Sequence, residues 1–138
     1  MDPVGTTPAD RAPYSGFTVY GEWYSTRDEL ARLVGDRAAA LFAYSISDAY
    51  GGDTARAFLR AHLESAGDDV DDPQLTEVEA LLMQWGRLIA TTPHAIDTGV
   101  AERVDEAFSE KLRGLLVSFA ALTVATNLYN TVGGTPGR

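Results

Sequence analysis

The sequence predicts an all-α protein of five or six helices, and three observations carry this prediction. Apolar residues recur at helical spacing along most of the chain. Capping residues and glycines separate these apolar stretches from one another. Strand-like and helix-like segments do not alternate, and no internal repeat is present. Since 138 residues with 45% apolar content fit one domain with its own core, we expect a flexible tail over residues 1–16 and a single helical domain over residues 17–138.

The first part of that domain is expected to begin with a non-helical segment. The aromatic stretch at residues 17–24 (FTVYGEWY) alternates only in part, which favours an extended N-terminal arm that crosses the domain or packs on another subunit. Thr26 and Glu29 then form a capping box. The apolar pattern that follows predicts one helix of about six turns over residues 29–50, which ends at Gly51-Gly52.

A second helix and an acidic loop come next. The helix is expected to begin at Asp53 or Thr54 and to end at Gly67. The stretch GDDVDDPQ at residues 67–74 concentrates four aspartates, but it lacks the residue order of a calcium-binding loop. We therefore expect a solvated loop there and no metal site.

Three more helices are expected in the second half. Thr76 and Glu79 form another capping box and begin a helix that ends near Ala90. The pair Thr92-Pro93 is expected to begin a short helix that includes residues 100–107. Ser109 is expected to cap the last helix, which continues to about Val132.

The composition excludes several classes of function. A formal charge of −9 without a cluster of Lys and Arg makes nucleic acid and anionic membranes poor partners. The chain has no cysteine, so disulfides and thiol chemistry are excluded. Residues 114–137 carry no charge, but their most apolar part is shorter than the roughly 20 residues that a bilayer needs, so we expect a buried helix. The first 16 residues lack the pattern of a signal peptide, which favours a cytoplasmic protein.

A few polar residues fall on faces that the helical period predicts to be buried. Tyr44, Ser45 and Asp48 extend the apolar face of the first helix, where they either emerge into solvent or line a pocket suited to proton transfer. His62 falls on the apolar face of the second helix, as a core residue or as a catalyst. No histidine pair has metal-ligand spacing and no GxSxG motif is present, so we expect general acid–base chemistry or none, without a metal or cofactor.

The most apolar run of the chain, AALTVATNLYNTVGG, ends on two asparagines. An amide buried without partners costs about 1–3 kcal/mol, so Asn127 and Asn130 need a reason to be there. Each amide can bond to backbone or to a neighbour across a helix contact. Alternatively, the two amides line a binding site.

The second half of the chain carries a series of short motifs with similar spacing to those of a known superfamily. These are Glu79-Ala80-Leu81-Leu82, Pro93, Ala107-Phe108-Ser109 and Asn127-x-x-Asn130. In this order they resemble the carboxymuconolactone decarboxylase and alkyl hydroperoxidase D (AhpD-like) superfamily. The resemblance implies an AhpD-like helical bundle that assembles as trimers or hexamers.

The chain departs from that superfamily where the peroxidase chemistry would be. The peroxidases carry Cys-x-x-Cys and a histidine at the end of the long helix, where this chain reads LFAYSISDAYGG. Disulfide-relay peroxidase activity is therefore excluded. The arginine that follows the second asparagine in the superfamily is replaced here by Thr131.

The resemblance implies a cofactor-independent enzyme that decarboxylates, isomerises or cyclises a small organic molecule by general acid–base chemistry. The expected catalytic residues are Tyr44, Asp48 and His62. The expected substrate-binding residues are Asn127, Asn130, Trp23 and Tyr24, of which an asparagine would donate to an oxyanion and the two aromatic residues would cover the pocket.

Two other interpretations remain open. The chain is either a catalytically inactive oligomeric scaffold or ligand-binding protein of the same fold, or an unrelated helical bundle whose last helix binds a partner. Convergence of Asp48 and His62 on one cavity would favour the enzyme. A filled apolar interior would favour the scaffold.

Overall fold

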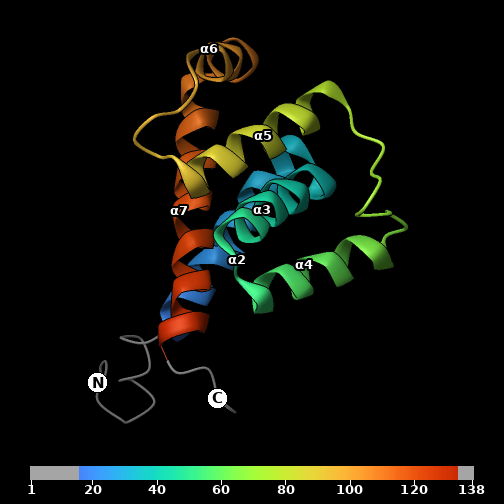
Figure 1. The fold of residues 1–138 in the computed structure, drawn as a ribbon, viewed down its shortest axis with the longest axis vertical. Helices are drawn as coiled ribbons and strands as arrows, with labels where there is room; N and C mark the ends of the chain where they lie inside the picture. The colour runs from blue at the N-terminus through green and yellow to red at the C-terminus, as the bar shows by residue number, and fades with distance from the viewer. Residues whose placement is uncertain (1–15, 134–138) are drawn as a thin grey trace.

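The computed structural model describes residues 16–133, and these form an all-helical bundle without strands. The described part of the chain forms six helices, and their arrangement is drawn in Figure 1. They are α2 (Gly16–Val34), α3 (Asp36–Tyr50), α4 (Asp53–Ser65), α5 (Glu77–Thr91), α6 (Thr98–Ala107) and α7 (Glu110–Val132). The all-α prediction is confirmed, whereas the predicted tail at residues 1–16 lies almost wholly outside the described residues.

Helix α3 is the central element of the bundle. All ten residues from position 38 to position 47 are buried, as expected for a helix that is covered on every side. Helices α2, α4, α5 and α7 all contact it (Figure 1). Its closest approach is to α5, where a Cβ at Gly86 would overlap the Ser45 hydroxyl.

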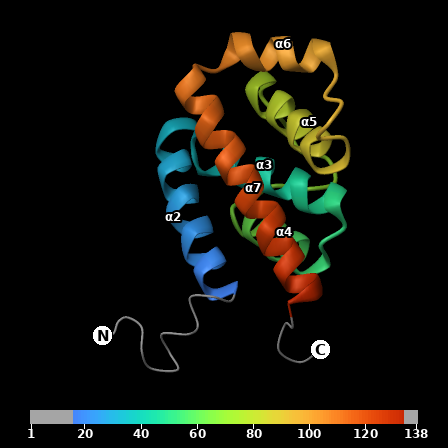
Figure 2. The ribbon, with the colours of Figure 1, turned by 90° about the vertical axis from the view of Figure 1, so that its left-hand side faces the viewer.

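Helices α2 and α7 form an antiparallel pair along one side of α3. Figure 2 shows the beginning of α2 beside the end of α7. Tyr20 and Tyr129 meet there in an edge-to-face contact with their ring centroids 5.9 Å apart. Further along the pair, Trp23 packs on Phe119 at 5.3 Å. Aromatic contacts therefore hold the first half of α2 against α7.

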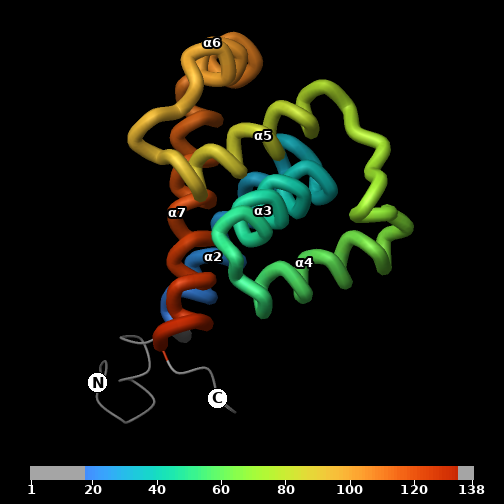
Figure 3. Tube along the Cα trace, in the orientation of Figure 1, coloured from blue at the N-terminus to red at the C-terminus, as the bar shows by residue number. Residues whose placement is uncertain are grey.

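The remaining elements surround this centre. Residues 66–76 form the long connection from α4 to α5, at the right of the tube in Figure 3. Thr76 and Glu79 make the predicted capping box at the start of α5, and Ser109 accepts from the Leu112 amide as the predicted cap of α7. Helix α6 lies across the beginning of α7 at the top of Figure 1. The predicted boundaries of α4, α5 and α7 are correct to within two residues.

The prediction for residues 17–24 is wrong, because this stretch is part of α2. Trp23 and Leu30 are buried one heptad apart on the face of α2 that contacts the core, which is a helical period rather than strand alternation. Thr26 lies inside the helix and does not cap it.

The predicted single helix over residues 29–50 is also wrong, because Gly35 divides it. Gly35 has a φ of 95°, a left-handed conformation that glycine adopts readily and that ends α2 before α3 begins. The short helix α6 differs from its prediction too. It begins at Thr98, and its cap is Asp97, whose carboxylate accepts from the Val100 amide, rather than Thr92.

Helix α7 is long and apolar enough to cross a bilayer by length and composition, yet it is built into the bundle. Leu116, Phe119 and Ala120 on its inner face are buried against the other helices. A third of the most apolar 18-residue window of α7 is buried inside the bundle. A cytoplasmic location stays a prediction.

Candidate functional site

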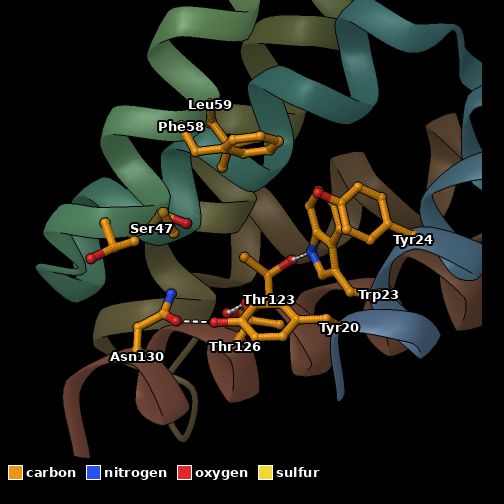
Figure 4. Close-up of a pocket in the computed structure, with 11 residues that line it drawn as sticks. Tyr20, Trp23, Tyr24, Ser47, Phe58, Leu59, Thr123, Thr126 and Asn130 are labelled. Carbon is orange, nitrogen blue, oxygen red and sulfur yellow. Dashed lines mark hydrogen bonds between the residues drawn. The ribbon is translucent and has the colours of Figure 1, made fainter. Parts of the chain in front are cut away.

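A cavity of about 200 Å³ lies between α2, α4 and α7, with the end of α3 behind it. We call it the aromatic pocket (Figure 4). Its apolar lining consists of Tyr20, Trp23, Tyr24, Ala55, Phe58 and Leu59, and its polar lining consists of Ser47, Thr54, Thr123, Thr126 and Asn130. Tyr24 and Phe58 are about half exposed and lie at its open edge.

Trp23 forms a fixed wall of the aromatic pocket. Its indole Nε1 donates to Thr123 Oγ1 over 2.9 Å, as Figure 4 shows. Tyr24 meets the indole ring edge to face with centroids 5.0 Å apart. The indole of Trp23 is therefore held by one hydrogen bond and by ring contacts with Tyr24 and Phe119.

Tyr20 closes the pocket toward the end of α7. Its hydroxyl donates to Asn130 Oδ1 across the helix pair (Figure 4). Burial raises the pKa of the Tyr20 hydroxyl, and the neighbouring Tyr129 raises it further. The phenol is therefore protonated at neutral pH and serves as a hydrogen-bond donor.

Asn127 lies behind the pocket rather than in its wall. Its Nδ2 donates to Ser47 Oγ over 3.0 Å and to the Thr123 carbonyl over 2.7 Å. Its Oδ1 faces Gly52, where a Cβ would overlap it. The buried amide thus bonds to backbone and to a neighbouring helix, and it positions the Ser47 hydroxyl that lines the pocket.

Tyr44 and Asp48 lie together in a different place, a groove between α3, α4 and α5. Asp48 is partly exposed, and its two carboxylate oxygens face Arg56 at 3.3 Å and Arg87 at 3.6 Å. Tyr44 is buried, as the helical period predicts. Asp48 is partly exposed to solvent and also lines the groove, so the structure combines the two expectations for the end of that helix.

His62 lies on the opposite side of α4 from that groove. Its Nε2 is 3.0 Å from Asp36 Oδ2, and the side chain is partly exposed at the surface. Arg60, which lines the groove, is two residues away, or about 200° around the helix. His62 and Asp48 therefore do not share a cavity in this arrangement.

Comparison with known proteins finds no relative. The chain matches no family model, and neither the curated proteins nor the solved structures contain a match. The resemblance to the AhpD-like superfamily therefore stays a prediction. Within residues 16–133 no group of acidic or histidine side chains is arranged to hold a metal ion.

Of the residues predicted to bind a substrate, Trp23, Tyr24 and Asn130 line the aromatic pocket and Asn127 supports it. Sequence reasoning missed Tyr20, Ser47, Phe58, Thr123 and Thr126. A signal for the last two was present, because Thr123, Thr126 and Asn130 recur on one face of the otherwise apolar α7. Tyr20 lies in the same stretch as Trp23 and Tyr24, and it lines the pocket where the beginning of α2 meets the end of α7.

Proposed function

We propose that the protein binds a small, uncharged and largely apolar molecule in the aromatic pocket. The observation that carries this proposal is the composition of the lining. Aromatic and aliphatic side chains form most of the wall, and several hydroxyls and one amide face the same space. Binding sites for small molecules typically combine an apolar wall with a few placed polar groups.

The volume limits the size of the ligand. An apolar cavity of roughly 150 Å³ accommodates benzene in a well-studied engineered protein, so a cavity of about 200 Å³ has room for a single ring with one or two small substituents. The half-exposed rings of Tyr24 and Phe58 lie at the edge, where such a ligand would enter.

The polar groups favour one hydroxyl or carbonyl substituent on the ligand. Ser47 Oγ accepts from Asn127, which leaves the hydroxyl proton of Ser47 as a donor. The Tyr20 oxygen donates its proton to Asn130 and retains lone pairs that can accept. A ligand with one polar substituent can satisfy these groups without an unpaired buried charge.

The pocket favours binding over catalysis. No carboxylate, imidazole or ammonium group is among its lining residues, so it offers no general base at neutral pH. This supports the ligand-binding interpretation of the chain. The catalytic roles of Tyr44, Asp48 and His62 stay predictions.

A titration with p-cresol tests the proposal, because p-cresol is a single ring with one hydroxyl. We expect it to raise the melting temperature and to change the emission of Trp23 in a saturable way. Benzoate, which has similar size and a full negative charge, is expected to bind at least about tenfold more weakly, since no cation lines the pocket.

A matched pair of variants locates the binding. Ala55 lines the pocket on α4, whereas Ala57 is exposed on the same helix and does not line it. Ala55→Leu is expected to abolish p-cresol binding, and Ala57→Leu is expected to leave it unchanged. Equal binding by both variants, or no saturable binding by the unaltered protein, would overturn the proposal.

We also propose that the protein is a homo-oligomer that associates through the outer face of α7. Val117, Ala121, Leu128 and Val132 are exposed there and recur at helical spacing. The stretch from residue 114 to residue 133 carries no charge, although the chain as a whole carries −9. A continuous exposed apolar stripe of this kind is typical of a protein–protein contact.

A further inference from the structure

We propose that the groove between α3, α4 and α5 binds a small organic carboxylate, whose charge is met by Arg87 and Arg56. This site is distinct from the aromatic pocket. The proposal rests on the volume of the groove, the arrangement of its arginines and its apolar floor.

The groove has the dimensions of a small-molecule site. Its volume is about 730 Å³, within the range of roughly 300–1,000 Å³ that is usual for ligand clefts. Side chains from α3, α4 and α5 form its walls, and the connection at residues 66–76 contributes one edge. Figure 1 shows these three helices and the connection around the same region.

Charged side chains of both signs line the groove. They are three arginines, Arg56, Arg60 and Arg87, and two aspartates, Asp48 and Asp71. Two further carboxylates, Asp53 and Glu64, lie outside the lining and pair with Arg56 and Arg60. The chain carries −9. A distant anion is therefore repelled by the protein, and an anion that binds must be held by local cations.

Arg60 is fully engaged and serves as part of the wall. Two of its nitrogens bond to the Asp71 carboxylate at 3.2 and 2.7 Å, and its Nε bonds to Glu64 at 3.1 Å. All the donor nitrogens of this guanidinium thus have acceptors. It neutralises Asp71 and leaves the other two arginines to determine the charge of the site.

Arg87 is the principal candidate for the anion contact. Its side chain is 51% exposed, and its nearest carboxylate oxygen, Asp48 Oδ2, is 3.6 Å away, which is beyond a normal hydrogen bond. Arg56 donates to Asp48 Oδ1 at 3.3 Å and is also paired with Asp53. Asp48 therefore lies between two guanidiniums, one of which keeps donors for a ligand. A planar guanidinium matches a carboxylate in a two-point contact.

The floor of the groove suits the apolar body of such a ligand. Val70, Leu75 and Met83 line the groove and are partly buried against the core. A carboxylate held at Arg87 would place an attached ring or chain over these side chains. The site is therefore matched to an amphipathic acid rather than to an inorganic anion.

A comparison of two probes tests this inference. We would titrate the protein with 3-phenylpropionate and with its neutral amide, 3-phenylpropanamide, and follow the backbone amide signals by NMR. The carboxylate is expected to shift the signals of Met83, Gln84 and Arg87, and to bind at least about tenfold more tightly than the amide, because only the carboxylate makes a charge-assisted bond.

Two variants in the groove are expected to act in opposite directions. Arg87→Gln should weaken 3-phenylpropionate binding about tenfold or more. Asp48→Asn should strengthen it, because it removes the competing carboxylate between Arg56 and Arg87. Arg32→Gln, which makes the same charge change at an exposed position on α2, is the control and should leave binding unchanged.

Three results would overturn the inference. They are equal affinities for the acid and its amide, unchanged binding by Arg87→Gln, and signal shifts confined to Trp23 and Tyr24. The last result would place the probe in the aromatic pocket. Failure here does not affect the p-cresol test, since the two experiments use ligands of different charge and variants in different cavities.

Discussion

Asn127 and Asn130 lie one turn apart on α7, yet their side chains have different surroundings. Asn127 is fully buried and bonds to Ser47 and to the Thr123 carbonyl. Asn130 is only partly buried and accepts from Tyr20 at the pocket. The neighbouring helices α2 and α3 supply partners for Asn130 and for the amide nitrogen of Asn127, whereas Asn127 Oδ1 is buried without a hydrogen-bond partner among the described residues.

Asn127→Asp is expected to destabilise the fold by about 3 kcal/mol or more, because a carboxylate would replace the amide at a fully buried position without a cation. The Thr123 carbonyl, which now accepts from the amide, would face a negative charge. Urea denaturation at neutral pH measures the effect. A loss below about 1 kcal/mol would contradict the role given to this side chain.

Tyr20 is expected to titrate above the ordinary value of 10.0, because burial raises its pKa in the folded state. Its contribution to stability is therefore complete below pH 10 and is lost as the pH rises through the higher folded value, since the unfolded chain releases the proton first. The phenolate absorbance of the unaltered protein minus that of Tyr20→Phe measures this single group. A difference curve with a midpoint at or below 10.0 would contradict the expectation.

Substitution of Asp48 and His62 tests their predicted catalytic roles. If Asp48 and His62 transfer protons, Asp48→Asn and His62→Ala each lower turnover of a substrate by roughly 10²-fold while the fold is retained. The structure gives His62 and Asp48 separate surroundings, with Asp36 beside one and Arg56 beside the other. Unchanged rates in both variants would contradict the catalytic assignment.

At the scale of the elements, local signals predicted the starts of α4, α5 and α7 but not those of α2, α3 and α6. The capping residues Thr76 and Ser109 were recognised because their bonds are local in sequence. The beginning of α2 was not recognised, because the helical face of this segment is evident only once Trp23 is placed against Thr123 and Phe119 on α7. Gly35 was missed because the apolar period continues across it.

The approach of α3 to α5 depends on Gly86. Gly86→Ala is expected to destabilise the fold by about 1–3 kcal/mol, since the new Cβ would overlap Ser45 Oγ and come within 3.1 Å of Ile46 and Phe42. The higher helix propensity of alanine, worth about 1 kcal/mol, offsets only part of this cost.

Gly114→Ala on α7 provides the matched control. Nothing lies within 4 Å of a Cβ at Gly114, so the same substitution is expected to stabilise the protein by about 0.5–1 kcal/mol. Thermal denaturation of the two variants measures both changes. Effects of the same sign would contradict the close contact described for Gly86.

The two apolar faces of α7 explain why its sequence resembles that of a membrane-spanning helix. Its inner face, with Leu116 and Phe119, is buried in the bundle. Its outer face, with Val117 and Leu128, is apolar and exposed. The exposed apolar residues of the outer face are those through which we propose that the protein associates.

At the scale of the whole molecule, the outer face of α7 predicts self-association. Light scattering is expected to give a mass three or six times the 14.8 kDa of one chain. Leu128→Asp should reduce that mass to the monomer, because it places a charge in the apolar stripe. Val78→Asp, at an exposed apolar residue on α5, should leave it unchanged. A monomeric unaltered protein would contradict the association.

The candidate site was only partly predictable from the sequence. Trp23, Tyr24 and Asn130 line the pocket, although the sequence predicts an extended arm rather than a helix for Trp23 and Tyr24. The helical period grouped Tyr44, Asp48 and His62 as residues on buried helix faces. The period of one helix does not reveal which neighbouring helix such a face contacts. Helix α4 directs His62 and Arg60 to opposite sides, and that separation depends on the packing of α4 beside α3.

The most direct test of the central claim is a crystal structure of the protein soaked with p-cresol. The account predicts a single ring between α2, α4 and α7, in contact with Trp23 and with its hydroxyl within hydrogen-bond distance of Ser47 or Tyr20. A ring bound elsewhere, or an aromatic pocket filled by its own side chains, would contradict the claim that this protein binds a small apolar ligand there.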